Sequence, residues 1–270
     1  MKTINISKKN STYQLIEALK NNKTKRHQEK LFFVEGVQNI KEAINNNWVI
    51  YSLIYSNYNK LSNWAKSILN LAEYNYVLSD DLMIQLSDKD NTSEILAIVR
   101  MKEEKVTYSK NPLILLFDRP SKKGNLGTIL RSADALFVDE FVFTGHSVDI
   151  YDSTVITSSM GSFFKVPFRF IETREEFENY YNRLKEKYPD IKIVGSSLQA
   201  NKFIQEEDFK SPLVLLAGNE ENGLSNYYND IADELVKINM RNNIDSLNVA
   251  NAITAILYEI DRQRNNNKRR

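Results

Sequence analysis

The chain has 270 residues, of which 42% are hydrophobic and 26% charged, as expected for a folded globular protein. It has no cysteine and only two histidines, His27 and His146, which excludes disulfides and thiolate zinc sites and argues against histidine-based catalysis. No apolar stretch reaches the roughly 18 residues of a membrane span, and the N-terminus lacks the apolar segment of a signal peptide. These features predict a cytoplasmic protein with no metal and no membrane partner.

The net charge is only +1, but the charges are unevenly placed. Residues 1–50 hold nine Lys/Arg against four Asp/Glu, and the last nine residues, 262–270, are also basic. Basic stretches at both ends favour an anionic partner. A solvated surface and a frayed tail would explain them as well.

Glycine and proline divide the chain into two parts. All five prolines and seven of the eight glycines lie after residue 110, and the polar stretch 101–111 reads as the join. We therefore predict two domains, 1–106 and 107–270. Periodicity in the first domain predicts a small α/β fold with helices at 13–21 and 37–46 and strands at 31–34, 49–55 and 95–100.

The second domain alternates strands with helices. Residues 113–117 form a continuous apolar run, which is typical of a strand buried on both faces. Pro112 and Pro212 each precede a predicted strand, where a missing N–H is tolerated. The pattern predicts a parallel sheet covered on both faces. Its strands are expected at 113–117, 140–143, 168–171, 191–194, 213–216 and 235–238, and its helices at 127–136, 153–159, 175–188 and 246–263.

Three short segments, 124–131, 218–225 and 245–250, place small and polar residues where a strand ends or a helix begins. Loops at the ends of rigid strands are where α/β proteins place their sites, so we expect the three to converge. The chain has no Gly-x-Gly-x-x-Gly after a first strand and no Walker lysine motif. A dinucleotide or nucleoside triphosphate cradle is therefore not supported.

The second segment predicts close backbone approach to a ligand. Gly218 and Gly223 bracket it directly after a strand, and glycine admits such an approach. Ile238, Met240 and Leu247 could wall an adenine-sized pocket. A tight turn with a helix cap is the alternative for the glycine pair.

Single polar residues in these segments have both structural and functional interpretations. Arg131 should point toward the N-terminal end of its helix, where it could bind a phosphate, or it is an exposed surface residue. Asn125 and Ser246 could each cap a helix. In the functional interpretation, Asn248 and Glu220 hold the loops around a substrate.

Taken in order, Asn-Leu-Gly-x-Ile-Leu-Arg, Gly-Asn-Glu-x-x-Gly-Leu-Ser and Ser-Leu-Asn-Val-x-x-Ala resemble the three motifs of the SpoU/TrmH-type RNA 2′-O-ribose methyltransferases, a branch of the SPOUT class. Residues 159–162, running to Val166-Pro167, are similar to a further signature of that family. The resemblance covers roughly 112–262. The stretch from Lys23 to Gly36 also resembles the small N-terminal substrate-binding domain of many members, which is similar to an RNA-binding ribosomal-protein fold.

The resemblance implies a parallel sheet with a C-terminal trefoil knot, S-adenosylmethionine bound within the knot, and a homodimer. Topology rules alone would make a knot improbable. Arg131 would be the key catalytic residue, with Asn125, Glu220, Ser246 and Asn248 shaping the site. The cofactor would meet Gly218, Ile238, Leu247 and Met240. Lys23, Lys25, Arg26 and Lys30 would contact the RNA backbone, with a solvated helix face as the alternative.

The chain departs from the family pattern at two points: 121–124 lacks the usual proline before Asn125, and Asn239 stands where proline is common. Neither departure removes a proposed catalytic group. The resemblance implies an RNA 2′-O-methyltransferase acting on 23S-type ribosomal RNA. The alternatives are a transfer RNA enzyme, a non-catalytic RNA-binding assembly factor of the same fold, and a nucleotide-binding α/β protein with other chemistry. The last would require a phosphate loop that is not found.

Overall fold

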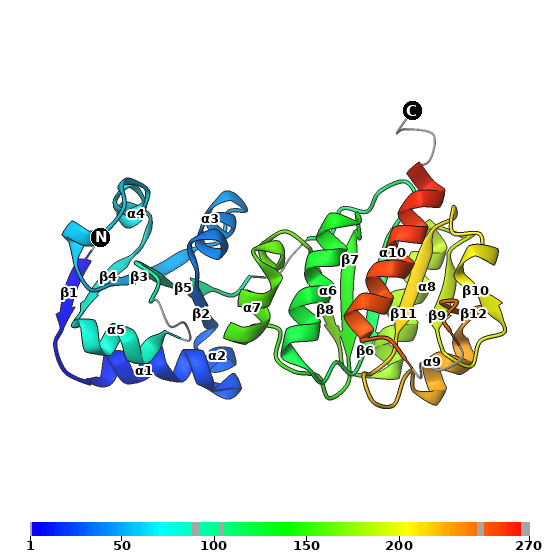
Figure 1. Cartoon of the computed structure of the whole chain (residues 1–270), viewed down its shortest axis with the longest axis horizontal. Helices are drawn as coiled ribbons and strands as arrows, with labels where there is room; N and C mark the ends of the chain where they lie inside the picture. Colours follow the sequence, from blue (N-terminus) through cyan, green and yellow to red (C-terminus); the bar gives the residue numbers. More distant parts are fainter. Residues whose placement is uncertain (1, 88–91, 103–104, 242–245, 266–270) are drawn as a thin grey trace. The chain divides into compact units, whose positions relative to one another are not determined.

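The computed structural model describes residues 2–87, 92–102, 105–241 and 246–265 (Figure 1). The chain divides into two compact units. Unit 1 is Met1–Glu103 together with Asp149–Lys165, and unit 2 is Glu104–Val148 together with Val166–Arg270. The predicted division at residue 106 placed 149–165 in the second domain, whereas in the structure this segment packs with the first.

Unit 1 is built on a five-stranded mixed sheet in the order β1-β4-β3-β5-β2. The strands β1, β4 and β3 pair in parallel, while β5 runs antiparallel to both β3 and β2. The strands are β1 (Lys2–Ile6), β2 (Leu31–Glu35), β3 (Ile50–Tyr55), β4 (Tyr74–Leu78) and β5 (Leu96–Arg100). The helices are α1 (Ser11–Asn21), α2 (Lys23–Glu29), α3 (Val37–Asn45), α4 (Asn63–Ile68) and α5 (Asp80–Leu86). Periodicity missed β1, β4, α2, α4 and α5, most of which are too short to show a clear period.

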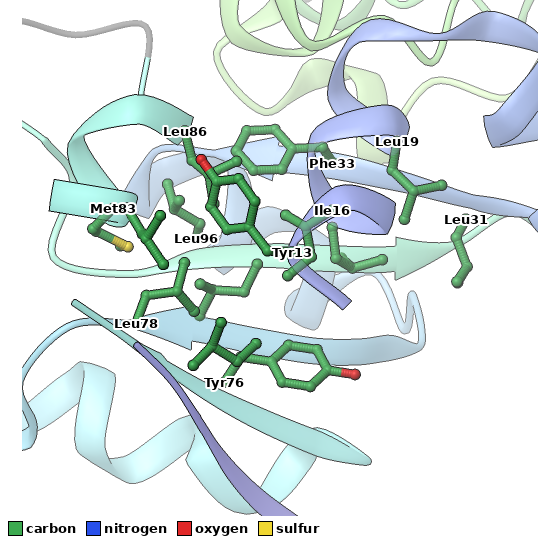
Figure 2. Packing of buried hydrophobic residues seen from close by; sticks show 14 residues of the cluster. Tyr13, Ile16, Leu19, Leu31, Phe33, Tyr76, Leu78, Met83, Leu86 and Leu96 are labelled. Atoms are coloured by element: carbon green, nitrogen blue, oxygen red, sulfur yellow. The ribbon is translucent and has the colours of Figure 1, made fainter. Parts of the chain in front are cut away.

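A hydrophobic core lies between one face of this sheet and the helices α1 and α5 (Figure 2). Tyr13, Ile16 and Leu19 project from α1, because positions three apart lie on one face of a helix. Leu86 from α5 and Leu96 from β5 meet them, and all five are at most 2% exposed. Burial of this stripe stabilises a helix whose average hydrophobicity is low.

The segment Asp149–Lys165 is held in unit 1 by aromatic packing. Phe163 lies against Trp48 and Phe32, with ring centroids 5.4 and 5.6 Å apart. The Trp48 indole N–H donates to the carbonyl of Phe164 at 3.1 Å. Gly161 has φ +98°, and a Cβ there would lie 2.6 Å from Cγ of Glu42. The Gly161 position within the signature at 159–162 therefore serves close packing within unit 1.

Unit 2 contains a seven-stranded sheet in the order β10-β12-β9-β11-β6-β7-β8, and every pairing is parallel. This confirms the predicted parallel sheet. The strands are β6 (Leu113–Asp118), β7 (Glu140–Thr144), β8 (Phe168–Ile171), β9 (Lys192–Ser196), β10 (Lys202–Phe203), β11 (Leu213–Ala217) and β12 (Glu234–Lys237). The central strands β6 and β11 are buried along their whole length, as their uninterrupted apolar sequence requires.

Helices cover both faces of this sheet. On one face, α6 (Lys123–Ala135) and α10 (Val249–Asn265) lie side by side, joined by a 2.6 Å hydrogen bond between the hydroxyls of Ser132 and Thr254 (Figure 1). On the other, α8 (Arg174–Lys187) and α9 (Asn226–Ile231) pack against Ile114, Leu116 and Val214. Helix α7 (Ser153–Ser159) is where the sequence predicted a helix, but it packs in unit 1.

Candidate functional site

A cavity of about 520 Å³ lies in unit 2 at the carboxyl ends of β9, β11 and β12, three neighbouring strands. Open α/β sheets bind ligands at this edge, and the volume falls in the usual range of roughly 300–1,000 Å³ for ligand pockets. Gly218, Ile238, Met240 and Leu247 all line it, so the four residues predicted to bind a cofactor are brought together. Glu220 and Ser246 line it as well.

The cavity combines an apolar wall with a polar loop. Ile238, Met240 and Leu247 supply the apolar wall together with Leu198, which is 57% exposed. Sequence reasoning missed the contribution of residues 196–199, although they are the last residue of the strand β9 and the three that follow it. These residues lie at the end of β9, between the ends of β11 and β12, from which cavity residues were predicted. That position was the feature of the sequence that could have predicted them.

The loop 218–225 folds back on itself, so that its own backbone forms one side of the cavity. Asn219 and Gly223 exchange two backbone hydrogen bonds, at 2.9 and 3.0 Å, and Oδ1 of Asn219 accepts the N–H groups of Glu221 and Asn222. Gly223 has φ +67°, a conformation that favours glycine. A Cβ at Gly218 would lie 2.3 Å from the backbone of Gly223 and Leu224. The alternative of a tight turn is thus confirmed in part, since both glycines are required by the loop itself.

We expect Gly218→Ala to open this loop and lower the affinity for the cavity's ligand, because the added methyl group meets backbone that cannot swing aside. Overpacking of this kind typically costs about 1–3 kcal/mol of stability. Thermal unfolding measures that loss. Gly124→Ala is the matched control, because its added Cβ meets no described atom within 4 Å apart from its chain neighbours and the adjacent backbone of its own helix. Equal unfolding temperatures in the two variants would contradict the prediction.

Glu220 connects the second segment to the first. Its Oε2 accepts hydrogen bonds from the Ser121 N–H at 3.0 Å and from the Ser121 hydroxyl at 2.7 Å. Its Oε1 accepts the Lys122 N–H at 3.0 Å and the side-chain amide of Asn125 at 3.3 Å. Burial alone would raise the pKa of Glu220, but the hydrogen bonds from Ser121 and Lys122 outweigh it and lower that pKa. The side chain is therefore a carboxylate at neutral pH.

Asn125 continues the connection to the third segment. Its Oδ1 accepts a hydrogen bond from the Asn248 side chain at 3.1 Å, and Oδ1 of Asn248 accepts the Ala250 N–H at 2.9 Å. The cap of α10 is thus Asn248, and Ser246 lies two residues before it, so the predicted capping role of Ser246 was wrong. Asn125 likewise does not cap α6, because the helix begins at Lys123 with Lys122 as N-cap. Asp245, which opens the third segment, lies outside the described residues.

Arg131 is exposed on α6, one to two turns after Asn125. Within the described part of the chain, its guanidinium has neither a hydrogen bond nor an ion pair. Arg131 lies on the same helix as Asn125, which is the middle residue of the Glu220–Asn125–Asn248 connection. Because it has no internal partner, it can bind an anionic ligand without first breaking an ion pair.

The four basic residues predicted to contact RNA lie in different environments. Lys23 and Lys30 are exposed, and Lys25 pairs with Glu29 at 2.6 Å. Arg26 departs from the expectation: it is 2% exposed and points into unit 1. Its Nε donates to Asp149 at 2.7 Å, and its NH1 donates to the carbonyls of Leu19 and Lys20. Arg26 is therefore a structural residue.

Removal of the buried Arg26 charge should destabilise unit 1. We expect Arg26→Met to lower its free energy of unfolding by about 3–5 kcal/mol, because the buried Asp149 would lose its arginine and keep only His27 and the Tyr151 N–H, each at 3.2 Å. Both tryptophans of the chain, Trp48 and Trp64, lie in unit 1, so urea unfolding followed by fluorescence reports on this unit. Lys23→Met, at an exposed site, is the control and should change stability little. A loss below about 1 kcal/mol for Arg26→Met would refute the structural role.

Among the described residues, no group of three or more His, Cys, Asp or Glu side chains could hold a metal ion. The helices of those same residues include none that is long and apolar enough to cross a membrane.

The fold and the cavity define an α/β protein with a ligand site at the carboxyl edge of a parallel sheet. Comparison with known proteins gives the family. Residues 112–258 match the SpoU rRNA Methylase family and residues 10–97 match the SpoU L30e-like domain. The chain belongs to the SpoU rRNA methylase family.

The similarity to characterised relatives extends over nearly the whole chain. A 23S rRNA (uridine(2479)-2′-O)-methyltransferase of Streptomyces viridochromogenes is 35% identical over 264 residues, covering 96% of this chain and 92% of that protein. The 23S rRNA (guanosine(2553)-2′-O)-methyltransferase RlmP of Bacillus subtilis is 26% identical, covering 91% and 98%. The crystal structure of the SpoU methyltransferase AviRb from S. viridochromogenes in complex with AdoMet is 35% identical. It superposes with a TM-score of 0.89 over 95% of this chain and 98% of that one.

Proposed function

We propose that this protein transfers a methyl group from S-adenosylmethionine to a ribose 2′-hydroxyl of 23S-type ribosomal RNA. The observation that carries the proposal is the cavity at the end of β9, β11 and β12, which adjoins the Glu220–Asn125–Asn248 connection between the three motif segments. The 35% identical relative is named for the same reaction class, and its family includes a structure with AdoMet bound.

The residues of the cavity fit S-adenosylmethionine. Ile238, Met240 and Leu247 provide an apolar wall suited to the adenine ring, and the backbone of the loop 218–224 provides hydrogen-bonding groups. When bound, the cofactor would supply an electrophilic methyl group to the 2′-oxygen, with the electron pair of the broken C–S bond leaving on sulfur and the hydroxyl proton passing to solvent. Glu220, Asn125 and Asn248 fix the loops that surround this reaction.

We assign Arg131 the role of binding an RNA phosphate and orienting the 2′-hydroxyl. An arginine side chain stays charged in proteins and is therefore a poor general base. A charged Arg131 can instead grip a phosphate through paired N–H donors. Correct placement of the hydroxyl relative to the methyl group then supplies a large part of the rate.

The proposal extends to the assembly around the site. We infer that unit 2 contains the C-terminal trefoil knot of SPOUT proteins, and that the enzyme is a cytoplasmic homodimer. Phe137 and Tyr258, beside or on the helices α6 and α10, are 67% and 56% exposed and are suited to an interface. Unit 1, with the exposed Lys23 and Lys30, would bind the RNA substrate.

Mass-spectrometric mapping of ribose methylation in total RNA, with and without the protein, tests the proposal. We expect one nucleotide of 23S rRNA to lose its methyl group when the protein is absent. A site in transfer RNA would redirect the proposal to that substrate. Calorimetry separates the remaining alternative: a folded protein that binds RNA but not S-adenosylmethionine would be a non-catalytic assembly factor.

A further inference from the structure

An ion pair between a buried carboxylate and a partly exposed arginine lies behind the loop 218–225, at the end of β6. Asp118 is the last residue of that strand and is 2% exposed. The next residue, Arg119, donates two hydrogen bonds to the Asp118 carboxylate, at 3.0 and 2.9 Å. The hydroxyl of Thr144, at the end of β7, donates a third at 3.1 Å. The pair is therefore anchored to the two neighbouring strands β6 and β7.

Both members of the pair also hold the loop. The Ser225 N–H donates to Asp118 at 2.8 Å, and Arg119 NH2 donates to the carbonyl of Gly223 at 3.2 Å. The carbonyl of Arg119 accepts the side-chain amide of Asn219 at 2.7 Å. The loop is thus attached near its beginning, at its turn and at its end to two consecutive residues. Neither residue is among the described residues that line the cavity.

The backbone at this point is fixed in an unusual conformation. Arg119 has φ +52°, which is uncommon outside glycine. Gly145 faces it with φ +62°, and a Cβ there would lie 2.8 Å from Cγ of Arg119. Strained conformations persist where the surroundings over-determine them, and they cluster at functional sites.

We propose that Asp118 and Arg119 are positioning residues for methyl transfer: they set the shape of the loop 218–225, and through it the cavity wall and the place of Glu220. The inference rests on the proposed function. It adds a second, inner attachment of the loop, separate from the outer one between Glu220 and Ser121, Lys122 and Asn125.

The test is Arg119→Met, which keeps most of the side-chain length and removes the guanidinium. We expect the Kd for S-adenosylmethionine, measured by calorimetry, to rise about 10- to 100-fold, as for the loss of hydrogen bonds to a charged group. With unmethylated 23S rRNA transcript, kcat should fall about a hundredfold while the KM for RNA changes little. Arg119→Lys should restore part of the loss, because a lysine can pair with Asp118 but cannot reproduce the fork that also reaches Gly223.

The matched control is Arg169→Met. Arg169 donates to the fully buried carboxylate of Glu140 at 2.8 Å. Glu140 is the first residue of β7, so this pair lies at the amino ends of the strands, whereas Asp118 lies at their carboxyl ends. This variant should lower the unfolding temperature but leave the Kd for S-adenosylmethionine unchanged. If Arg119→Met behaves like this control, the pair is only structural and the proposal is overturned.

Hydrogen exchange of the backbone amides 219–225, followed by mass spectrometry on the full chain, gives a readout that does not depend on catalysis. We expect faster exchange in Arg119→Met than in Arg169→Met. Unchanged exchange in Arg119→Met overturns the proposal. The two proposals can fail separately. If the wild type does not bind S-adenosylmethionine but Arg119→Met still speeds exchange in the loop, the proposed function is refuted while the attachment of the loop to Asp118 and Arg119 is supported.

Discussion

Arg131→Ala should lower turnover by about a hundred- to a thousandfold while leaving S-adenosylmethionine affinity unchanged. Loss of one preorganised donor at a reaction centre typically has an effect of this size. Affinity for the cofactor should persist, because Arg131 is not among the described residues that line the cavity. Single-turnover methylation of 23S rRNA transcript measures the rate, and calorimetry measures the affinity.

Two further variants test the assigned role of Arg131. Arg183→Ala, at an exposed arginine of α8, is the control and should behave as wild type. Arg131→Lys keeps the positive charge but loses the paired donors, so its rate should lie between those of wild type and Arg131→Ala. Nearly full turnover of Arg131→Lys would show that the shape of the guanidinium has no role.

The sequence predicted the central strands of unit 2, such as β6 and β11, well, because each is a short apolar run that the parallel sheet buries on both faces. The two-residue edge strand β10 was missed. Helix starts were predicted less well. α6 begins at Lys123, four residues before the predicted start at Gly127. Its N-cap is Lys122, and lysine is not a residue type that marks the start of a helix. Its first turn is instead supported by the Glu220 carboxylate, which accepts the Lys122 N–H from almost a hundred residues away. Local patterns cannot reveal such a partner.

The same reason explains the misassigned residues. The sequence does not distinguish the four basic residues Lys23, Lys25, Arg26 and Lys30. Of these four, only Arg26 forms ion pairs with carboxylates of the segment 149–165, those of Asp149 and Asp152. That segment belongs to unit 1 because its aromatic residues pack there, and nothing in its own sequence states which domain those rings will meet. Asp118 and Arg119 escaped notice because their role depends on loop contacts about 100 residues away.

The three motif segments could be predicted to converge because each follows a strand end or precedes a helix. The chain of contacts that joins them could not. The side-chain amide of Asn125 donates a hydrogen bond to Glu220, and the side-chain amide of Asn248 donates one to Asn125. These side chains come within reach of one another only when the sheet has folded. Glu220 accepts four hydrogen bonds in this arrangement, so its removal is expected to have the second large effect.

Glu220→Gln should weaken S-adenosylmethionine binding by about 10- to 100-fold, as for the loss of hydrogen bonds to a charged group. In the wild type, both carboxylate oxygens accept backbone N–H groups, from Ser121 and from Lys122. A glutamine must turn its NH2 group toward one of these donors, because it has only one acceptor oxygen. Calorimetry measures the loss, with Glu186→Gln, at an exposed site on α8, as the control.

The same carboxylate predicts a pH dependence. Because folding lowers the pKa of Glu220 from its usual 4.5, its stabilising contribution is fully present above about pH 4.5 and is lost as pH falls through the lower folded value. The difference in stability between wild type and Glu220→Gln should therefore be constant from neutral pH down to about 4.5 and shrink below it. A difference that instead shrank between pH 7 and pH 5 would mean that Glu220 is protonated near neutrality, and the charged connection between the motif segments would be wrong.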